Sequence, residues 1–276
     1  MESRNLFILA LKELRDALLN KWFWLYTGIF IVLSFGLAQF GMTGIGEYGV
    51  AGFGRTAASL VNIVVLIVPL MGMTLGALSL ASERERGTLL YLLTHPVLES
   101  EVLLGKYLGL GLAIFATLGI GFGLTGLSLG LRGGVSHLSG YLALTGFAVL
   151  LAFGSLSLGF LISSLASKGS TAVGVAIFLW LTWVFLSDLG LLGASLVLKL
   201  KAQQLLFLAL MNPAQVFKMM AIHVLRGGLE ILGPAGLSAM RTFGTGLPWI
   251  LTGLLVFWIL APLGAAGVIF QKRGGL

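Results

Sequence analysis

The sequence predicts an all-α polytopic membrane protein with six transmembrane helices and an amphipathic helix ahead of the first. Among the 276 residues, 58% are hydrophobic and 10% are charged, and the mean hydropathy is +1.03. Uncharged stretches repeatedly reach the roughly 20 residues that cross about 30 Å of hydrocarbon. They lack the alternation of barrel strands, and a helix satisfies its own backbone groups in lipid, so we expect helices throughout.

The first element is an interfacial helix at residues 3–21. Its apolar face carries Phe7, Leu11, Leu14 and Leu18. Its polar face carries Lys12, Glu13, Asp16 and Asn20. Such a helix is expected to lie in the headgroup region of the membrane, in contact with lipid, before the chain turns inward near Lys21. The alternative is an ordinary soluble leader helix. The apolar run that follows is too long for the core of a removable signal peptide.

The spans themselves form a single transmembrane domain over residues 1–276. We expect them at 22–46, 56–82, 107–131, 133–167, 169–187 and 242–271. A seventh span through 202–225 is rejected because it would contain Lys218 and the break at Asn212-Pro213. Glycine spacings predict close helix packing at four places. They are Gly72-x-x-x-Gly76, Gly105-x-x-x-Gly109, Gly119-x-x-x-Gly123 and Gly126-x-x-x-Gly130.

The positive charges of the short loops favour cytoplasmic termini. With both termini inside, ten of the seventeen Lys and Arg residues are cytoplasmic, and five of the others lie in the long segment 199–247, where the positive-inside rule is weak. A multi-pass protein of the cytoplasmic (inner) membrane is therefore expected. The chain has no cysteine, which excludes disulfides, thiolate metal sites and sulfur nucleophiles within it.

A dense charged island separates the second and third spans, at residues 83–106. The capping-box spacing from Ser82 to Glu85 predicts that the second span ends near Ser82 and that a short helix begins there. His95-Pro96 ends that helix, and Ser100 and Glu101 offer a new start for the third span. The plainest interpretation is a solvated loop whose charges orient the spans.

The island and the span layout resemble the ABC-2 type permeases. The resemblance rests on the run from Glu83-Arg84-Glu85-Arg86-Gly87-Thr88 through Thr94-His95-Pro96 to Leu104-Gly105-Lys106. It implies a type V exporter-like transmembrane domain whose coupling helices dock on a cytoplasmic ABC ATPase dimer. The ATPase-coupling residues it implies are Glu83, Arg84, Glu85, Arg86, Gly87, Thr88, Thr94, His95, Pro96, Glu101, Gly105 and Lys106.

ATP hydrolysis is not expected in this chain. The nearest approach to a phosphate-binding loop, at Gly105-Lys106, has Ser100 in place of the first glycine and Tyr107 after the lysine. We therefore expect a permease subunit that binds no cofactor and no nucleic acid. By the resemblance, ATP and Mg²⁺ belong to the ATPase subunits, and a second copy of the permease completes the transporter.

Within this family the chain is most similar to permeases that serve the maturation of nitrous-oxide reductase. The similarity rests on Trp180, Trp183 and Asp188 and on the segment around Asn212-Pro213. It implies a sulfur- or copper-related cargo and a periplasmic copper-handling partner. The alternatives are a general exporter of lipid, peptide or antibiotic and, lower, an ion-coupled secondary transporter. The last normally needs a midplane ionisable group, and no ionisable residue is expected deep within a span.

Two further sets of residues are candidates for contact with cargo or partner. Polar side chains in the spans either line a pathway or satisfy nearby backbone groups: Asn62, Thr74, Ser155, Ser157 and Thr182. The segment 199–247 is expected to form short amphipathic helices at the outer surface that dock a protein or contact lipid. Its candidate residues are Asn212, Pro213, Lys218, Met219, His223 and Arg226. No metal site is expected, and Met219 and His223 are only weak Cu(I) candidates, since methionine is a common gap-filler.

Overall fold

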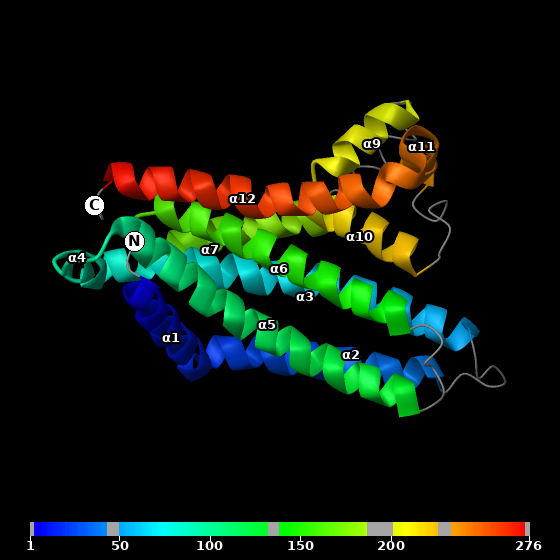
Figure 1. The fold of residues 1–276 in the computed structure, drawn as a ribbon, viewed down its shortest axis with the longest axis horizontal. Coiled ribbons are helices and arrows are strands. Elements are labelled where there is room, and N and C mark those ends of the chain that lie inside the picture. Colours follow the sequence, from blue (N-terminus) through cyan, green and yellow to red (C-terminus); the bar gives the residue numbers. More distant parts are fainter. Residues whose placement is uncertain (1–2, 43–49, 132–137, 187–200, 226–232, 274–276) are drawn as a thin grey trace.

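The protein is all-helical, as Figure 1 shows. The computed structural model describes residues 3–42, 50–131, 138–186, 201–225 and 233–273. In these ranges the long helices are α2 (Lys21–Met42), α3 (Val50–Glu85), α5 (Glu99–Leu131), α6 (Leu138–Leu165) and α12 (Leu247–Arg273). Helix α7 (Gly169–Leu181) is shorter and continues as a π-helical turn at Thr182–Leu186. Four helices are long and apolar enough to span a membrane, or up to six if each of two bent pairs is one span. The predicted fold class is confirmed.

Helix α1 (Ser3–Leu19) crosses the others steeply and packs on α5. The chain bends by 72° between α1 and α2, and there the Asn20 side chain accepts a hydrogen bond from the Trp22 backbone N–H at 2.9 Å. Phe7, Leu11 and Leu18 are exposed, as the amphipathic pattern predicts for a helix in contact with lipid. Glu13 was expected on the polar outer face, but it is buried.

The reason for the burial of Glu13 is the close approach of α1 to α5. A side chain at Gly105 would place its Cβ 2.6 Å from the Cβ of Leu9, and one at Gly109 would lie 2.6 Å from the Cβ of Glu13. Only glycine allows this approach, so the predicted glycine seam exists and its partner is α1.

Helices α3 and α6 form the centre of the bundle and make the most extensive helix contact. A Cβ at Gly76 would lie 2.7 Å from the Leu156 carbonyl oxygen, and one at Gly159 would lie 2.6 Å from that of Met73. The glycine seam at Gly72 and Gly76 is thus confirmed. At Gly119, Gly123 and Gly130 no described atom lies within 4 Å of the Cβ position, so the Gly119–Gly123 spacing forms no seam within the described chain. In the Gly126–Gly130 spacing only Gly126 has a close neighbour, since its Cβ would lie 2.9 Å from the ring of Tyr141.

The short helix α4 (Thr88–Leu93) projects from one end of the bundle between α3 and α5. The prediction that a helix begins at Ser82 is wrong: α3 continues to Glu85, and the Ser82 hydroxyl donates to the Leu78 carbonyl of its own helix. The break falls instead at Gly87, whose φ of +73° is in the left-handed region that glycine adopts readily. Helix α5 starts at Glu99, where the Glu101 carboxylate accepts from the Leu98 N–H at 3.2 Å.

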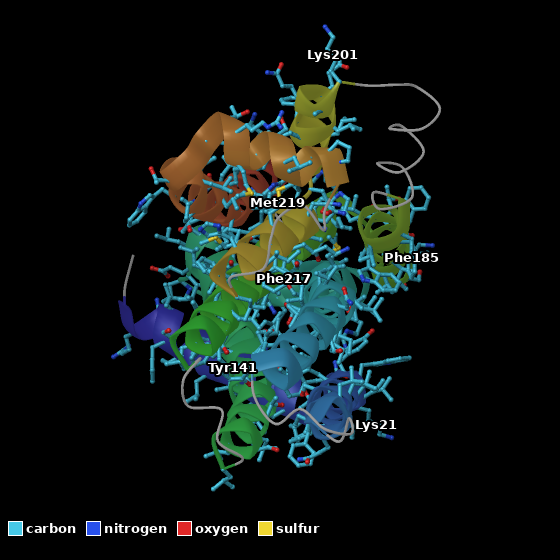
Figure 2. The ribbon with its side chains drawn as sticks, turned by 90° about the vertical axis from the view of Figure 1, so that its right-hand side faces the viewer. Lys21, Tyr141, Phe185, Lys201, Phe217 and Met219 are labelled. Carbon is cyan, nitrogen blue, oxygen red and sulfur yellow. The ribbon has the colours of Figure 1, made fainter. Side chains whose placement is uncertain are left out.

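At the opposite end the chain forms α9 (Ala202–Leu210), α10 (Pro213–Val224) and α11 (Gly233–Phe243), followed by a 3-10 turn at Gly244–Gly246. A bend of 107° separates α9 from α10. The expected break at Asn212-Pro213 is therefore present. Helix α10 does not lie on the surface, however, since it packs on α12 and α6, and Phe217 and Met219 are buried within the bundle (Figure 2).

Candidate functional site: the junction behind helix α4

Three consecutive charged residues at the end of α3 bind three different parts of the bundle. Successive residues of an α-helix point about 100° apart, so Glu83, Arg84 and Glu85 face different neighbours. The hydrogen bonds and ion pairs of each residue show which helix it contacts. Together they make the end of α3 a junction, which we call the α3 junction.

Glu83 joins α3 to α5 and α1 through a buried lysine. The Lys106 ammonium lies 2.8 Å from Oε1 of Glu83 and 2.5 Å from Oε1 of Glu13, and only 1% of its side chain is exposed. Lys12 adds a second cation at 3.3 Å from Glu13 and 3.5 Å from Glu83. A buried ammonium needs such partners, because desolvation otherwise disfavours the charge strongly.

Arg84 joins α3 to the end of α6. Its Nη1 donates to the carbonyl oxygens of Ser163 at 3.1 Å and Ala166 at 2.6 Å. Arg273 of α12 donates to the neighbouring Leu165 carbonyl at 2.7 Å. The last carbonyls of a helix have no partner within it and carry partial negative charge, so the two guanidinium groups both satisfy and neutralise the end of α6.

Glu85 joins α3 to the start of α7. Its Oε2 accepts a hydrogen bond from the Gly169 N–H at 2.9 Å. The first N–H groups of a helix are unpaired and carry partial positive charge, which makes a carboxylate a favourable partner. Within two residues, α3 therefore places a cation at a helix C-terminus and an anion at the next helix N-terminus.

The rest of the predicted coupling residues divide between the exposed surface and the interior. The exposed residues on or beside α4 are Arg86, Gly87, Thr88, Thr94, His95 and Pro96. Glu101, Gly105 and Lys106 are buried on α5. Glu101 accepts a hydrogen bond from the Asn5 side chain of α1 at 3.4 Å, which gives α1 and α5 a second polar link.

Sequence reasoning missed two groups of residues at this end of the protein. Glu13 is the second carboxylate on Lys106, and no local motif marked it. The second group is Leu90 and Tyr91 of α4, which expose 57% and 71% of their surface. Leu89 of the same helix is buried. A six-residue helix with one buried leucine has its other side free, but which side is free depends on how α4 packs on α3, so the sequence carried no signal for it.

The polar residues predicted for a pathway do not converge on one cavity. The hydroxyls of Thr74, Ser155 and Thr182 donate to carbonyls of their own helices, at Leu70, Leu151 and Phe178. Ser157 bonds the Tyr107 hydroxyl at 3.0 Å across α5 and α6. Asn62 is exposed on α3. Thr74 lines a cavity of about 440 Å³, together with Trp22, Tyr26 and residues of α7.

The predicted outer docking residues lie mostly within the packing. Asn212 is buried, accepts from the Ala214 N–H at 2.8 Å and donates to the Trp183 carbonyl at 2.8 Å, so it caps α10 and holds it to the π-helical turn. Pro213 and Met219 are also buried, Lys218 is half-buried, and His223 is exposed. Arg226 lies outside the described residues. Among the described residues, no cluster of three or more His, Asp or Glu side chains is placed to hold a metal.

Comparison with known proteins agrees with this architecture. The family model described as ABC-2 family transporter protein matches residues 7–274. The chain is 34% identical over 275 residues to a protein of Pseudomonas aeruginosa named probable ABC transporter permease protein NosY, covering 96% of this chain and 97% of that protein. A protein of Stutzerimonas stutzeri with the same name is 32% identical over 272 residues, with the same coverage. This multi-pass membrane protein belongs to the ABC-2 family of ABC transporter permeases.

Proposed function

We propose that the chain is one permease half of an ATP-driven transporter in the inner membrane, paired with a second copy and with a cytoplasmic ABC ATPase dimer. The observation that carries the proposal is the exposed helix α4, whose free face presents Leu90 and Tyr91 directly beyond the α3 junction. An apolar face on a charged, solvent-side turn is suited to a protein partner. Both chain termini then lie in the cytoplasm, on the same side as α4.

The α3 junction supports a route for the coupling. A shift of α4 by the ATPase reaches the end of α3, where Glu83, Arg84 and Glu85 are bonded to α5 and α1, to α6 and to α7. Nucleotide binding would then favour one arrangement of the spans through its different contacts with the two states. The buried Lys106 is part of this route and is not available to the ATPase directly.

The docking role of α4 is tested by co-purification of the chain with candidate cytoplasmic ABC ATPases. Tyr91→Asp adds a charge to the exposed face of α4 without touching the junction, and it is expected to abolish capture of the ATPase. Phe207→Asp is the matched control, because Phe207 is an aromatic residue exposed to 65% on α9 at the opposite end. Equal capture by both variants contradicts the proposal, as does a well-folded wild-type chain that captures none of the candidates.

For the cargo, we propose a sulfur- or copper-related species used in the maturation of nitrous-oxide reductase. The proposal is supported by the similarity to proteins named NosY over nearly the whole chain. The elements α9 to α11 are the proposed contact for a periplasmic copper-handling partner. Expression of the chain in a denitrifying bacterium that lacks its own permease of this kind is expected to restore a copper-loaded, active reductase. A stable chain that restores none favours a general exporter of lipid, peptide or antibiotic.

A further inference from the structure

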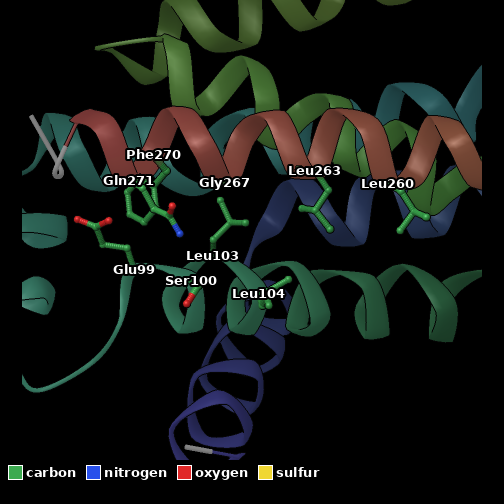
Figure 3. Close-up of a pocket in the computed structure, with 10 residues that line it drawn as sticks. Glu99, Ser100, Leu103, Leu104, Leu260, Leu263, Gly267, Phe270 and Gln271 are labelled. Atoms are coloured by element: carbon green, nitrogen blue, oxygen red, sulfur yellow. The ribbon is translucent and has the colours of Figure 1, made fainter. Parts of the chain in front are cut away.

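A groove of about 310 Å³ runs between α5 and α12 at the end of the bundle that carries α4 (Figure 3). Its floor and walls are apolar and include Leu103 and Leu104 of α5 and Leu260 and Leu263 of α12. The hollow exists because α12 presents Gly264 and Gly267 to it. A Cβ at Gly267 would lie 3.9 Å from Leu103, and one at Gly264 would meet no described atom within 4 Å.

The groove opens on an exposed, apolar side of the bundle. Helix α12 is the least buried of the four long apolar helices, and its exposed residues include Leu260 and Val268. From Leu260 to Gln271, the groove follows eleven residues of helix, or about 16 Å at 1.5 Å per residue. That length is about half of the roughly 30 Å hydrocarbon thickness. The groove therefore matches the depth of one leaflet.

Polarity changes along the groove in the same sense as along a phospholipid. Glu99, Ser100 and Gln271 lie at the end nearest α4, and the opposite end is lined by Leu260 and Leu263 (Figure 3). Glu99 makes no ion pair within the described residues. The polar mouth thus offers one acceptor carboxylate.

We propose that this groove binds a phospholipid whose headgroup carries a primary ammonium, with one acyl chain between α5 and α12. The ammonium lies at the Glu99 carboxylate, and the acyl chain lies over Gly264 and Gly267. An anionic headgroup without an amine would leave Glu99 facing a negative charge, which is unfavourable at the low dielectric of the interface. A second protein helix, about 10 Å across with its side chains, is too wide for a groove of this volume.

The test reconstitutes the full chain in bilayers of equal phosphatidylethanolamine and phosphatidylglycerol, then extracts it in detergent and identifies the retained lipid by native mass spectrometry. The wild type is expected to retain phosphatidylethanolamine over phosphatidylglycerol by about threefold, the ratio produced by one partly exposed ion pair. Gly264→Leu fills the groove and is expected to remove the retained lipid. Gly253→Leu is the matched control on α12, since Gly253 also has open space at its Cβ position and does not line the groove.

A separate variant tests the headgroup. Glu99→Gln keeps the shape of the side chain, so a retained lipid is expected to persist while the preference for phosphatidylethanolamine falls to the bulk ratio. Retention by Gly264→Leu equal to that of Gly253→Leu overturns the acyl-chain site. A wild-type preference for phosphatidylglycerol, the absence of any preference, or a preference that survives Glu99→Gln overturns the ammonium assignment.

Discussion

At the scale of single residues, Lys106 is the most deeply buried charge among the described residues. Lys106→Met leaves Glu13 and Glu83 close together without the buried cation between them, and removal of one partner of a buried ion pair costs about 3–5 kcal/mol. Unfolding in mixed detergent micelles is expected to show that loss. Lys12→Met is the control, because Lys12 is about half exposed and its pairs are worth about 1 kcal/mol or less. Equal stability of the two variants would contradict the role of Lys106.

The same residue shows what a sequence allows at this scale. Lys106 was found from its motif, but its partner Glu13 was placed on the polar face of an amphipathic helix. The two residues are 93 positions apart, and their meeting depends on how closely α1 approaches Gly105 and Gly109. The charge pattern within one helix does not predict how closely that helix approaches its neighbour. Likewise, the exposure of Leu90 and Tyr91 was not predictable from the sequence, because it depends on which face of α4 packs on α3.

At the scale of elements, the glycine seam between α3 and α6 predicts a sharp difference between positions with the same spacing. Gly76→Val forces a side chain against the Leu156 carbonyl and Gly159, so helix separation and loss of the folded monodisperse protein are expected in size-exclusion chromatography. Gly119→Val meets no described atom within 4 Å and is expected to elute as the wild type does. Similar elution of the two variants would contradict the close packing of α3 on α6 at Gly76.

The elements that were predicted less well are those whose signal was ambiguous. Ser82 and Glu85 have capping-box spacing, yet the Ser82 hydroxyl bonds within α3 and Glu85 serves the N-terminus of α7 instead. Helix α10 lies in the segment 199–247, which was expected to form short amphipathic helices at the outer surface and which includes Lys218 and His223. Its burial follows from Phe217, Met219 and Met220, which pack into the bundle and outweigh those two polar positions.

At the scale of the whole molecule, the arrangement places α4 and α9 at opposite ends of the bundle. The absence of cysteine lets single-cysteine variants report this without background. Tyr91→Cys is expected to react with a membrane-impermeant maleimide only from the cytoplasmic side, and Phe207→Cys only from the other side. Labelling of both variants from one side would contradict the proposed orientation.

The long spans were predictable because the length and polarity of each segment are properties of the sequence alone. All six expected spans overlap described helices, although the segment from 187 to 200 lies outside the described residues. Helix α7 is too short to count among the candidate spans, whereas the bent pair of α9 and α10, in the segment rejected as a seventh span, is long and apolar enough to be one. The arrangement of those helices was not predictable. It depends on which glycine faces which neighbour, and Gly119 and Gly76 look alike in the sequence.

Helix α4 is joined to α3 by only Arg86 and Gly87. In the proposed coupling, so short a linker would absorb little rotation, and a rotation of α4 would be passed to the last turn of α3. Two extra glycines after Gly87 would make this linker longer and more flexible. They would leave α4 and the contacts of Glu83, Arg84 and Glu85 in place. The expected result is an uncoupled transporter. The ATPase stays bound and hydrolyses ATP at an unchanged rate, while transport stops.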